Sequence, residues 1–163
     1  MKTPFAIIIN GAINSGKTSV SKALQRLIPR LAHVEVDDIG AFIQWMPLEQ
    51  RIPLNLKNAG LVGRVFLDAG IPVVISYPLM EDEHARLVQA LAPYPSHTFT
   101  LSPSLEIAQS NRGSRILEPR EAERVAYHYK IGISKPSFGV IIDNGRETPD
   151  ASALRIWNAV RGG

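Results

Sequence analysis

The chain has 163 residues, 45% of them hydrophobic and 20% charged, a balance typical of a globular protein with one sizeable core. It contains no cysteine, which excludes disulfide bonds, thiolate chemistry and cysteine-bound zinc. The net charge of +3 comes without a basic tail, and no stretch approaches the roughly 18 apolar residues of a membrane span. We expect a soluble cytoplasmic protein with one domain over residues 1–163.

The first predicted element is a short strand over residues 5–9, an apolar run that suits burial on both faces. Directly after it, residues 11–18 read GAINSGKT, a full match to the phosphate-binding pattern G-x-x-x-x-G-K-[ST]. Residues 19–28 follow with one apolar stripe at helical spacing, and Pro29 marks the end of that helix. This order of strand, loop and helix is the context that the motif requires.

Each part of this loop suits the phosphates of a nucleotide. Gly11 and Gly16 can adopt backbone conformations that residues with a side chain rarely adopt. This leaves the backbone N–H groups of the loop free to face an anion. The helix directs its positive dipole end to the same place, Lys17 adds a charge for the terminal phosphates, and Thr18 offers a hydroxyl to Mg²⁺. The loop residues expected to bind the nucleotide are Gly11, Ala12, Asn14, Ser15, Gly16, Lys17, Thr18 and Ser19.

A second strand is predicted over residues 33–37, where alternation puts Glu35 and Asp37 on one face. Both lie at the carboxyl end of this strand, the edge at which ligands bind in open α/β sheets. A carboxylate there is able to accept the proton of an attacking hydroxyl or to hold Mg²⁺ through water. Asp37 is our candidate for this catalytic role, whereas Glu35 is either functional or only solvated.

The next carboxylate, Asp38, has two interpretations. We expect it mainly to cap a short helix over residues 39–46, and the alternative is a metal or substrate ligand. Phe42, Trp45 and Met46 on that helix are expected to pack more than to bind.

Strands and helices alternate along the rest of the chain, after a connector with two prolines at residues 47–53. This alternation predicts an α/β protein with a parallel sheet and helices on both faces. The expected helices cover residues 56–69, 81–92, 104–110 with Ser104 as cap, 120–130 and 152–160, and the expected strands cover residues 71–76, 97–101 and 140–143.

A polar segment with a glycine, Gly113, joins two of these helices at residues 111–120 and has the character of a closing lid. Phosphoryl transfer develops charge on the equatorial oxygens of the transferred group, and mobile arginines stabilise that charge. Arg112 and Arg115 are therefore candidate catalytic residues, with a solvated loop as the alternative. The four histidines lack the spacing of metal ligands, and we expect them to be structural or to lie at the surface. They are His33, His84, His97 and His128.

Taken together, these stretches resemble the small P-loop kinases. The matching segments are IIINGAINSGKTS, HVEVDDIGAFI, LSPSLEIAQSNRGSR with ERVAYHY, and VIIDNGRETPDAS, in this order over nearly the whole chain. The resemblance is to the chloramphenicol phosphotransferase-like and AAA-type small-molecule kinases, and more distantly to shikimate and gluconate kinases. It implies a three-layer α/β/α fold, five parallel strands in the order 2-3-1-4-5, a short helical lid, and ATP as phosphate donor.

The same resemblance implies roles for individual residues. Lys17 and Thr18 match the ligands of phosphate and Mg²⁺, and Asp37 matches the carboxylate that takes the proton of the acceptor hydroxyl. Glu35 matches the first carboxylate of the Asp-x-Asp pair of shikimate kinase-like enzymes. Arg112 and Arg115 match the lid arginines, with Arg112 also expected on the nucleotide, and Asn144 lies in the segment that matches the loop near the adenine.

The sequence departs from the pattern of this family after the third strand. Ser76-Tyr77-Pro78 stands where related proteins often carry acidic residues, so Mg²⁺ is expected to rely on Thr18, on Asp37 or Asp38, and on water. The glycine-rich acceptor segment of shikimate kinase is missing as well, so shikimate is not expected as substrate.

Three hypotheses follow. The first is an ATP-dependent phosphotransferase acting on a hydroxyl group of a small molecule, a metabolite or antibiotic. The second is a nucleotide-binding module with slow hydrolysis and a protein partner, and the third is a polynucleotide 5′-hydroxyl kinase, which the modest charge disfavours. The acceptor stays open: Arg51 or Arg64 is a candidate ligand for an acidic group, with a surface ion pair as the alternative. The oligomeric state is not predicted.

Overall fold

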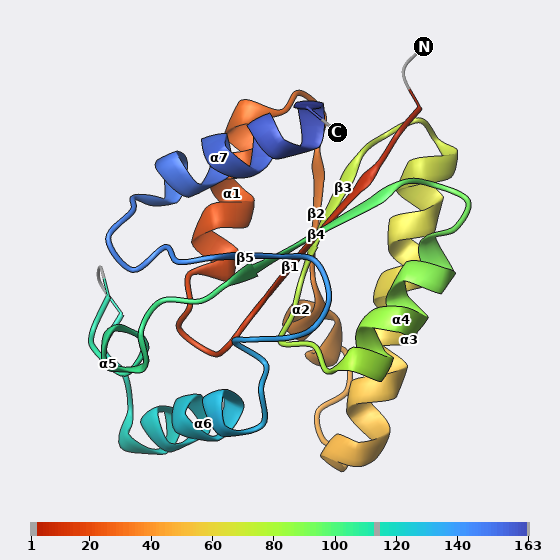
Figure 1. Ribbon diagram of the computed structural model, residues 1–163. Coiled ribbons are helices and arrows are strands. Elements are labelled where there is room, and N and C mark those ends of the chain that lie inside the picture. The colour runs from red at the N-terminus through yellow and green to blue at the C-terminus, as the bar shows by residue number, and fades with distance from the viewer. Residues whose placement is uncertain (1–2, 113–114, 163) are drawn as a thin grey trace.

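The computed structural model describes residues 3–112 and 115–162, so the expectation placed on Gly113 lies outside the described residues. Five strands form one sheet in which every described pairing is parallel, in the order β2-β3-β1-β4-β5 (Figure 1). This confirms the predicted class and strand order. The strands are β1 (Ala6–Gly11), β2 (Ala32–Glu35), β3 (Val73–Ser76), β4 (Ser96–Leu101) and β5 (Val140–Ile142).

Helices cover both faces of the sheet. In Figure 1, α1 and α7 lie together on one side of it and α3 and α4 on the other, while α5 and α6 lie near the end of the sheet at which β1 enters the phosphate-binding loop. The helices are α1 (Lys17–Leu27), α2 (Val36–Gly40), α3 (Leu48–Asp68), α4 (Glu81–Leu91), α5 (Leu105–Ala108), α6 (Pro119–Lys130) and α7 (Pro149–Gly162).

The central strand β1 explains the two-sided core. Its side chains alternate between the faces of the sheet, and all of them are buried. Ile7 and Ile9 pack in the cluster that contains the buried residues of α1 and α7, whereas Ile8 packs in the cluster of α3 and α4. A continuous apolar run is therefore required here, and β1 holds the loop that follows it at the centre of the sheet.

The segment after β2 differs from the prediction. The strand ends at Glu35, and α2 begins at Val36, so Asp37 lies in the first turn of a helix and not on the strand. Asp38 lies inside α2, and no side chain caps this helix; the expected capping role of Asp38 is therefore wrong. The prediction from strand alternation is wrong beyond Glu35, because a buried residue at position 36 suits the first turn of a helix as well as a strand.

The expected helix over residues 39–46 does not form, because α2 stops at Gly40. Phe42 and Trp45, which were expected to pack, have 85% and 78% of their surfaces exposed. The predicted connector over residues 47–53 is instead the first part of α3, which runs from Leu48 with Pro53 inside it. Pro53 is the sixth residue of α3, beyond the first four residues whose N–H groups have no partner within the helix, so it removes one backbone hydrogen bond near the start of α3.

The helices α5 and α6 flank the predicted lid, and both are capped by side chains at their N-terminal ends. Ser104 caps α5, as predicted, because its hydroxyl accepts a hydrogen bond from Ile107 N at 3.3 Å. At the start of α6 the side chain of Glu121 returns to Glu118 N at 3.1 Å in a capping box. Within the described residues, no helix is both long and apolar enough to cross a bilayer.

Candidate nucleotide and phosphoryl-transfer site

The loop between β1 and α1 has the backbone geometry that its glycines predict. Gly11 and Gly16 have φ values of 149° and 98°. A Cβ on Gly11 would lie 2.5 Å from the Ser15 hydroxyl oxygen and 2.6 Å from the Leu101 carbonyl oxygen, so only glycine fits there. Asn14 also adopts a left-handed conformation, with φ 61°, which the sequence did not indicate.

Lys17 lies at the start of α1 with its ammonium group drawn back over the loop. Its Nζ donates a hydrogen bond to the carbonyl oxygen of Ala12 at 2.8 Å. Burial lowers the pKa of Lys17 to about 8; Glu35 and Asp37 oppose this fall, and Arg115 adds to it. The charges of two carboxylates and one arginine therefore converge on the residue that the motif assigns to the terminal phosphates.

Thr18, the second motif residue on α1, contacts the end of β2. Its hydroxyl donates a hydrogen bond to Oε2 of Glu35 at 2.8 Å. Burial raises the pKa of Glu35, and the hydrogen bond from Thr18 opposes the rise. On its other side Glu35 Oε2 lies 3.7 Å from Nε2 of His33, which in turn bonds the Ser76 hydroxyl at 3.0 Å. The carboxylate next to the Thr18 hydroxyl is thus that of Glu35, to which sequence reasoning gave a lesser role than to Asp37 or Asp38.

Asp37 and Asp38 diverge from this pair. Asp37 is exposed on α2, and its charge raises the pKa of both Lys17 and Tyr77. Asp38 is also exposed, and it lines the cavity between α2 and α3 described below together with Glu35 and His33. Of the two, only Asp37 acts electrostatically on the loop, as its proposed role requires.

Tyr77, just after β3, marks the far side of the site. Burial raises the pKa of Tyr77 to about 12, and Asp37 and Glu83 add to the rise. The charges of Arg51 on α3 and Arg124 on α6 oppose it. The charges of two arginines from two different helices therefore act on Tyr77, as does that of Asp37. Sequence reasoning named Arg51 as a possible acceptor ligand, and it grouped Arg124 with the lid arginines and not with the acceptor.

The other arginine named for the acceptor, Arg64, belongs to a surface network. Its Nε donates to Asp68 at 2.8 Å, it also contacts the Ala92 carbonyl, and its guanidinium stacks over the Tyr94 ring at 5.3 Å. The surface ion pair, left open as the alternative for Arg64, is what the structure contains.

Both lid arginines reach the site. Nη1 of Arg112 donates to the Asn14 carbonyl oxygen at 3.2 Å, which places this guanidinium on the loop. Arg115 pairs with Glu121 at 2.5 Å and lies near enough to Lys17 to lower its pKa. Arg115 N also donates to the Arg112 carbonyl at 3.1 Å, so the two residues form a tight pair.

Three asparagines in or next to the loop form hydrogen bonds to other segments of the protein. Nδ2 of Asn144 donates to the Ser15 carbonyl at 2.9 Å, and Asn144 is buried, so its side chain braces the loop. Nδ2 of Asn14, expected on the nucleotide, donates instead to the carbonyls of Ala108 and Ser110. Asn10, which the sequence did not single out, bonds three other segments through its buried amide: Leu79, Thr100 and Ile133.

His128 makes a structural contact with the loop. It was expected to be structural or superficial, and its Nδ1 accepts a hydrogen bond from the backbone N–H of Ile13 at 3.2 Å. These residues are 115 positions apart. The pattern Tyr127-His128-Tyr129 carries no local signal for such a contact.

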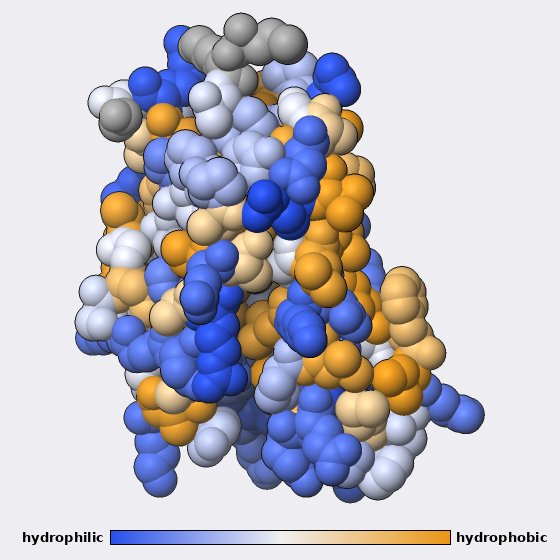
Figure 2. Space-filling model, turned by 90° about the vertical axis from the view of Figure 1, so that its right-hand side faces the viewer, coloured by the Kyte–Doolittle hydropathy of each residue, from blue (hydrophilic) through white to orange (hydrophobic). Residues whose placement is uncertain are grey.

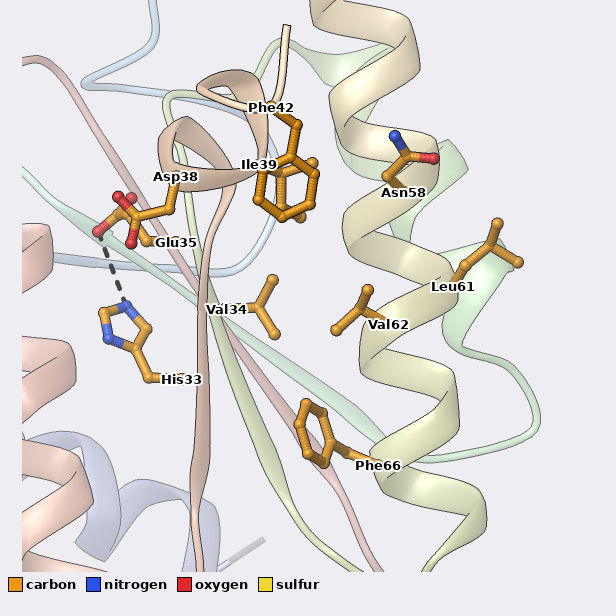
Figure 3. A pocket seen from close by; sticks show the side chains of 10 residues that line it. All are labelled: His33, Val34, Glu35, Asp38, Ile39, Phe42, Asn58, Leu61, Val62 and Phe66. Carbon is orange, nitrogen blue, oxygen red and sulfur yellow. Dashed lines mark ion pairs between the residues drawn. The ribbon is translucent and has the colours of Figure 1, made fainter.

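An apolar cavity of about 490 Å³ lies beside the site, between β2, α2 and α3 (Figure 3). Val34, Val62 and Phe66 face one another across it, and Phe42 and Ile39 lie above them. On the side of the molecule that carries α3 and α4, Figure 2 shows a band of apolar side chains between polar ones. The exposed apolar residues of α3 are Leu48, Leu61, Val62 and Val65.

The donor set suits a magnesium ion that phosphates help to bind. Within residues 3–112 and 115–162, no three His, Asp or Glu side chains gather into a metal site. Mg²⁺ in nucleotide sites takes one or two protein oxygens, phosphate oxygens and water. The Thr18 hydroxyl and the Glu35 carboxylate, 2.8 Å apart at the start of α1, are hard oxygen donors of this kind.

No protein-family model and no curated protein matches the chain in sequence. Solved structures match it in fold over nearly its whole length. The APS kinase of Mycobacterium tuberculosis in complex with AMPPNP and APS has a TM-score of 0.73 at 16% identity, over 98% of both chains. A gluconokinase from Sinorhizobium meliloti has a TM-score of 0.69 at 18% identity, over 99% of this chain and 97% of its own.

The tunicamycin resistance protein of Deinococcus radiodurans matches with a TM-score of 0.65 at 20% identity, over 96% of this chain and 95% of its own. Identities this low establish the fold alone. At that level the resemblance predicted from the sequence is confirmed: the chain has the three-layer fold of the small-molecule P-loop kinases.

Proposed function

We propose that the protein is an ATP-dependent phosphotransferase that transfers the terminal phosphoryl group of ATP to a hydroxyl group of a small molecule. The observation that carries the proposal is the hydrogen bond between Thr18 and Glu35. It fixes the end of β2, and with it the start of α2 and Asp37, beside the phosphate-binding loop. A nucleotide on the loop and an acceptor hydroxyl at Asp37 would therefore lie next to each other. The similar folds of a gluconokinase and an APS kinase also support this proposal.

The residues divide the chemistry between them. Asp37 accepts the proton of the acceptor hydroxyl while the new O–P bond forms and the bond to the leaving oxygen of ADP breaks. Lys17, Arg112 and Arg115 stabilise the negative charge on the transferred group. Thr18 and Glu35 would hold Mg²⁺, either directly or through water, and the ion would neutralise charge on the phosphate oxygens. Glu35 therefore takes the place that the sequence gave to Asp38.

An acceptor with a negatively charged group is favoured. Arg51 and Arg124 both act on Tyr77, which lies next to the space faced by Asp37. Arg51 is half-buried, and neither arginine takes part in an ion pair between described residues. A carboxylate or phosphate on the acceptor would supply the missing partner and orient its hydroxyl toward Asp37.

The test is a coupled assay of ADP release across a panel of hydroxyl compounds, with sugar acids, phosphorylated alcohols, neutral polyols and cationic antibiotics in separate sets. We expect acceptor-dependent release with the anionic sets, and a phosphorylated product in mass spectrometry. Turnover with the neutral or cationic sets alone would contradict the acceptor class and leave the phosphotransferase intact. ADP release that no compound stimulates would contradict the phosphotransferase.

A second candidate is a nucleotide-binding module with slow hydrolysis and a protein partner. The exposed apolar side chains on α3, with Val65 67% and Leu61 57% exposed, favour it because monomeric proteins seldom expose several such residues on one helix. Slow ATP hydrolysis that is independent of every acceptor, together with a stable complex that Val65→Glu abolishes, would distinguish it from the kinase.

A further inference from the structure

The tip of the phosphate-binding loop, Ile13 and Asn14, is held by the helices on both sides of the lid. From α5 and the residues after it, the carbonyls of Ala108 and Ser110 accept hydrogen bonds from Asn14 Nδ2 at 2.8 and 2.9 Å. From α6, Nδ1 of His128 accepts one from Ile13 N at 3.2 Å. The tip therefore has fixed partners on the rest of the protein, in addition to the glycine turns of the loop itself.

The contact with His128 has a definite chemistry. A histidine that accepts a hydrogen bond at Nδ1 carries its single proton on Nε2 and is neutral, because an imidazolium has two donors and no acceptor. The charged groups that face it are Lys17 on α1 and Arg124 on its own helix. Burial, together with these two cations, lowers the pKa of His128 to about 4. The imidazole is thus kept in the form that can accept the Ile13 N–H group across the physiological range.

We propose that His128 is a positioning residue for nucleotide binding, which holds the loop tip in its phosphate-binding conformation through Ile13 N–H without itself contacting the phosphates. The inference rests on the proposed function only in that the loop binds a nucleotide. It adds a residue outside the P-loop motif to the binding machinery.

The reason that a tether is needed lies in the next residue. Asn14 has φ 61°, a left-handed conformation that asparagine adopts more readily than most residues but that is not its preferred one, so a loop without partners would populate other conformations as well. Phosphates bind to backbone N–H groups that must already point inward, so affinity depends on how well the loop is held beforehand. His128 holds Ile13, and the two carbonyls before the lid hold the side chain of Asn14.

The experiment compares two substitutions in the full chain. His128→Asn keeps a side-chain oxygen near the place of Nδ1, whereas His128→Leu has a similar volume and no acceptor. Tyr127→Leu, at the adjacent exposed position of α6, is the matched control for changes in helix stability. For each protein, AMPPNP binding is measured by calorimetry, and the hydrogen exchange of the Ile13 amide is measured in the free protein.

We expect His128→Leu to weaken AMPPNP binding about tenfold and to speed exchange of the Ile13 amide, as for the loss of one hydrogen bond. His128→Asn should restore both to within about threefold of the wild type, and Tyr127→Leu should change neither. Wild-type affinity and exchange in His128→Leu would overturn the proposal.

Two further outcomes separate the positioning role of His128 from a direct contact with the nucleotide and from the proposed function. If His128→Asn binds as weakly as His128→Leu while its Ile13 amide stays protected, the imidazole itself contacts the nucleotide and the positioning role is wrong. If the wild-type protein does not bind AMPPNP at all, the proposed function fails, and with it the role in binding. The exchange of the Ile13 amide in the free variants would then still decide whether His128 holds the loop.

Discussion

The hydroxyl of Thr18 donates a hydrogen bond to the Glu35 carboxylate at 2.8 Å, and this contact joins the first turn of α1 to the end of β2. The kinases that the sequence resembles are expected to carry acidic residues after the third strand, whereas this chain has Ser76-Tyr77-Pro78, in which Ser76 is the last residue of β3. Here Ser76 forms a hydrogen bond with the imidazole of His33. The carboxylate oxygen beside Thr18 comes from Glu35, at the end of the neighbouring edge strand β2. We propose that this carboxylate from β2 compensates for the departure seen in the sequence.

Glu35→Gln tests this assignment through the metal. The amide keeps the size of the side chain but removes its charge, so we expect the Mg²⁺ concentration for half-maximal ATP binding to rise about tenfold. Binding of ATP in the presence of a chelator should stay within about threefold of the wild type. A titration of Mg²⁺ at fixed concentrations of protein and fluorescent ATP analogue measures the effect.

Asp38→Asn is the control for this prediction, since Asp38 lies three residues further on inside α2, and the Thr18 hydroxyl bonds Glu35 rather than Asp38. It should leave the Mg²⁺ midpoint unchanged. A shift in Asp38→Asn without one in Glu35→Gln would return the metal role to Asp38.

Local patterns predict the fold well because the signals are local. The apolar strand, the GAINSGKT loop and the striped helix occupy adjacent positions, and each strand of the sheet is followed by a helix before the next. The boundary at Val36 was missed because a buried residue there fits both a strand and a helix. The partners of the loop were missed for another reason. Glu35 lies 17 positions from Thr18 and His128 lies 115 from Ile13, and only the packing of β2 beside α1 and of α6 against the loop brings them together.

The lowered pKa of Lys17, about 8, predicts a pH dependence of nucleotide binding. Bound phosphates favour the charged ammonium, so the pKa of Lys17 is higher in the nucleotide-bound protein than in the free protein. Above about pH 8, nucleotide binding is therefore coupled to the uptake of a proton by Lys17. Affinity for ATP should therefore be level at lower pH and should fall above about pH 8, by up to about tenfold per unit. Calorimetry from pH 7 to 9.5 measures this slope. Lys17→Arg, which stays charged, should remove it; a slope that persists in Lys17→Arg belongs to another group.

Asp37→Asn should separate binding from transfer. The amide cannot accept the proton of the acceptor hydroxyl, so we expect the transfer rate to fall by about 10²–10⁴. Affinity for ATP should change less than about threefold, because Asp37 is exposed and lies on α2, outside the loop. Single-turnover transfer to the acceptor found in the panel measures the first quantity, and calorimetry the second. Transfer at the wild-type rate would mean that another group takes the proton.

Gly11→Ala should damage the loop and the stability of the fold together. The added Cβ would lie 2.6 Å from the Leu101 carbonyl, a backbone atom of β4 that cannot move freely, and the φ of 149° is strained for alanine. We expect unfolding at lower denaturant concentration, with a loss of about 2 kcal/mol or more, and ATP binding weakened at least tenfold. Gly162→Ala, near the end of α7 with open space around it, is the control and should be neutral. A Gly11→Ala protein as stable as the control would show that β1 and β4 are able to separate there, and the steric account of the loop would be wrong.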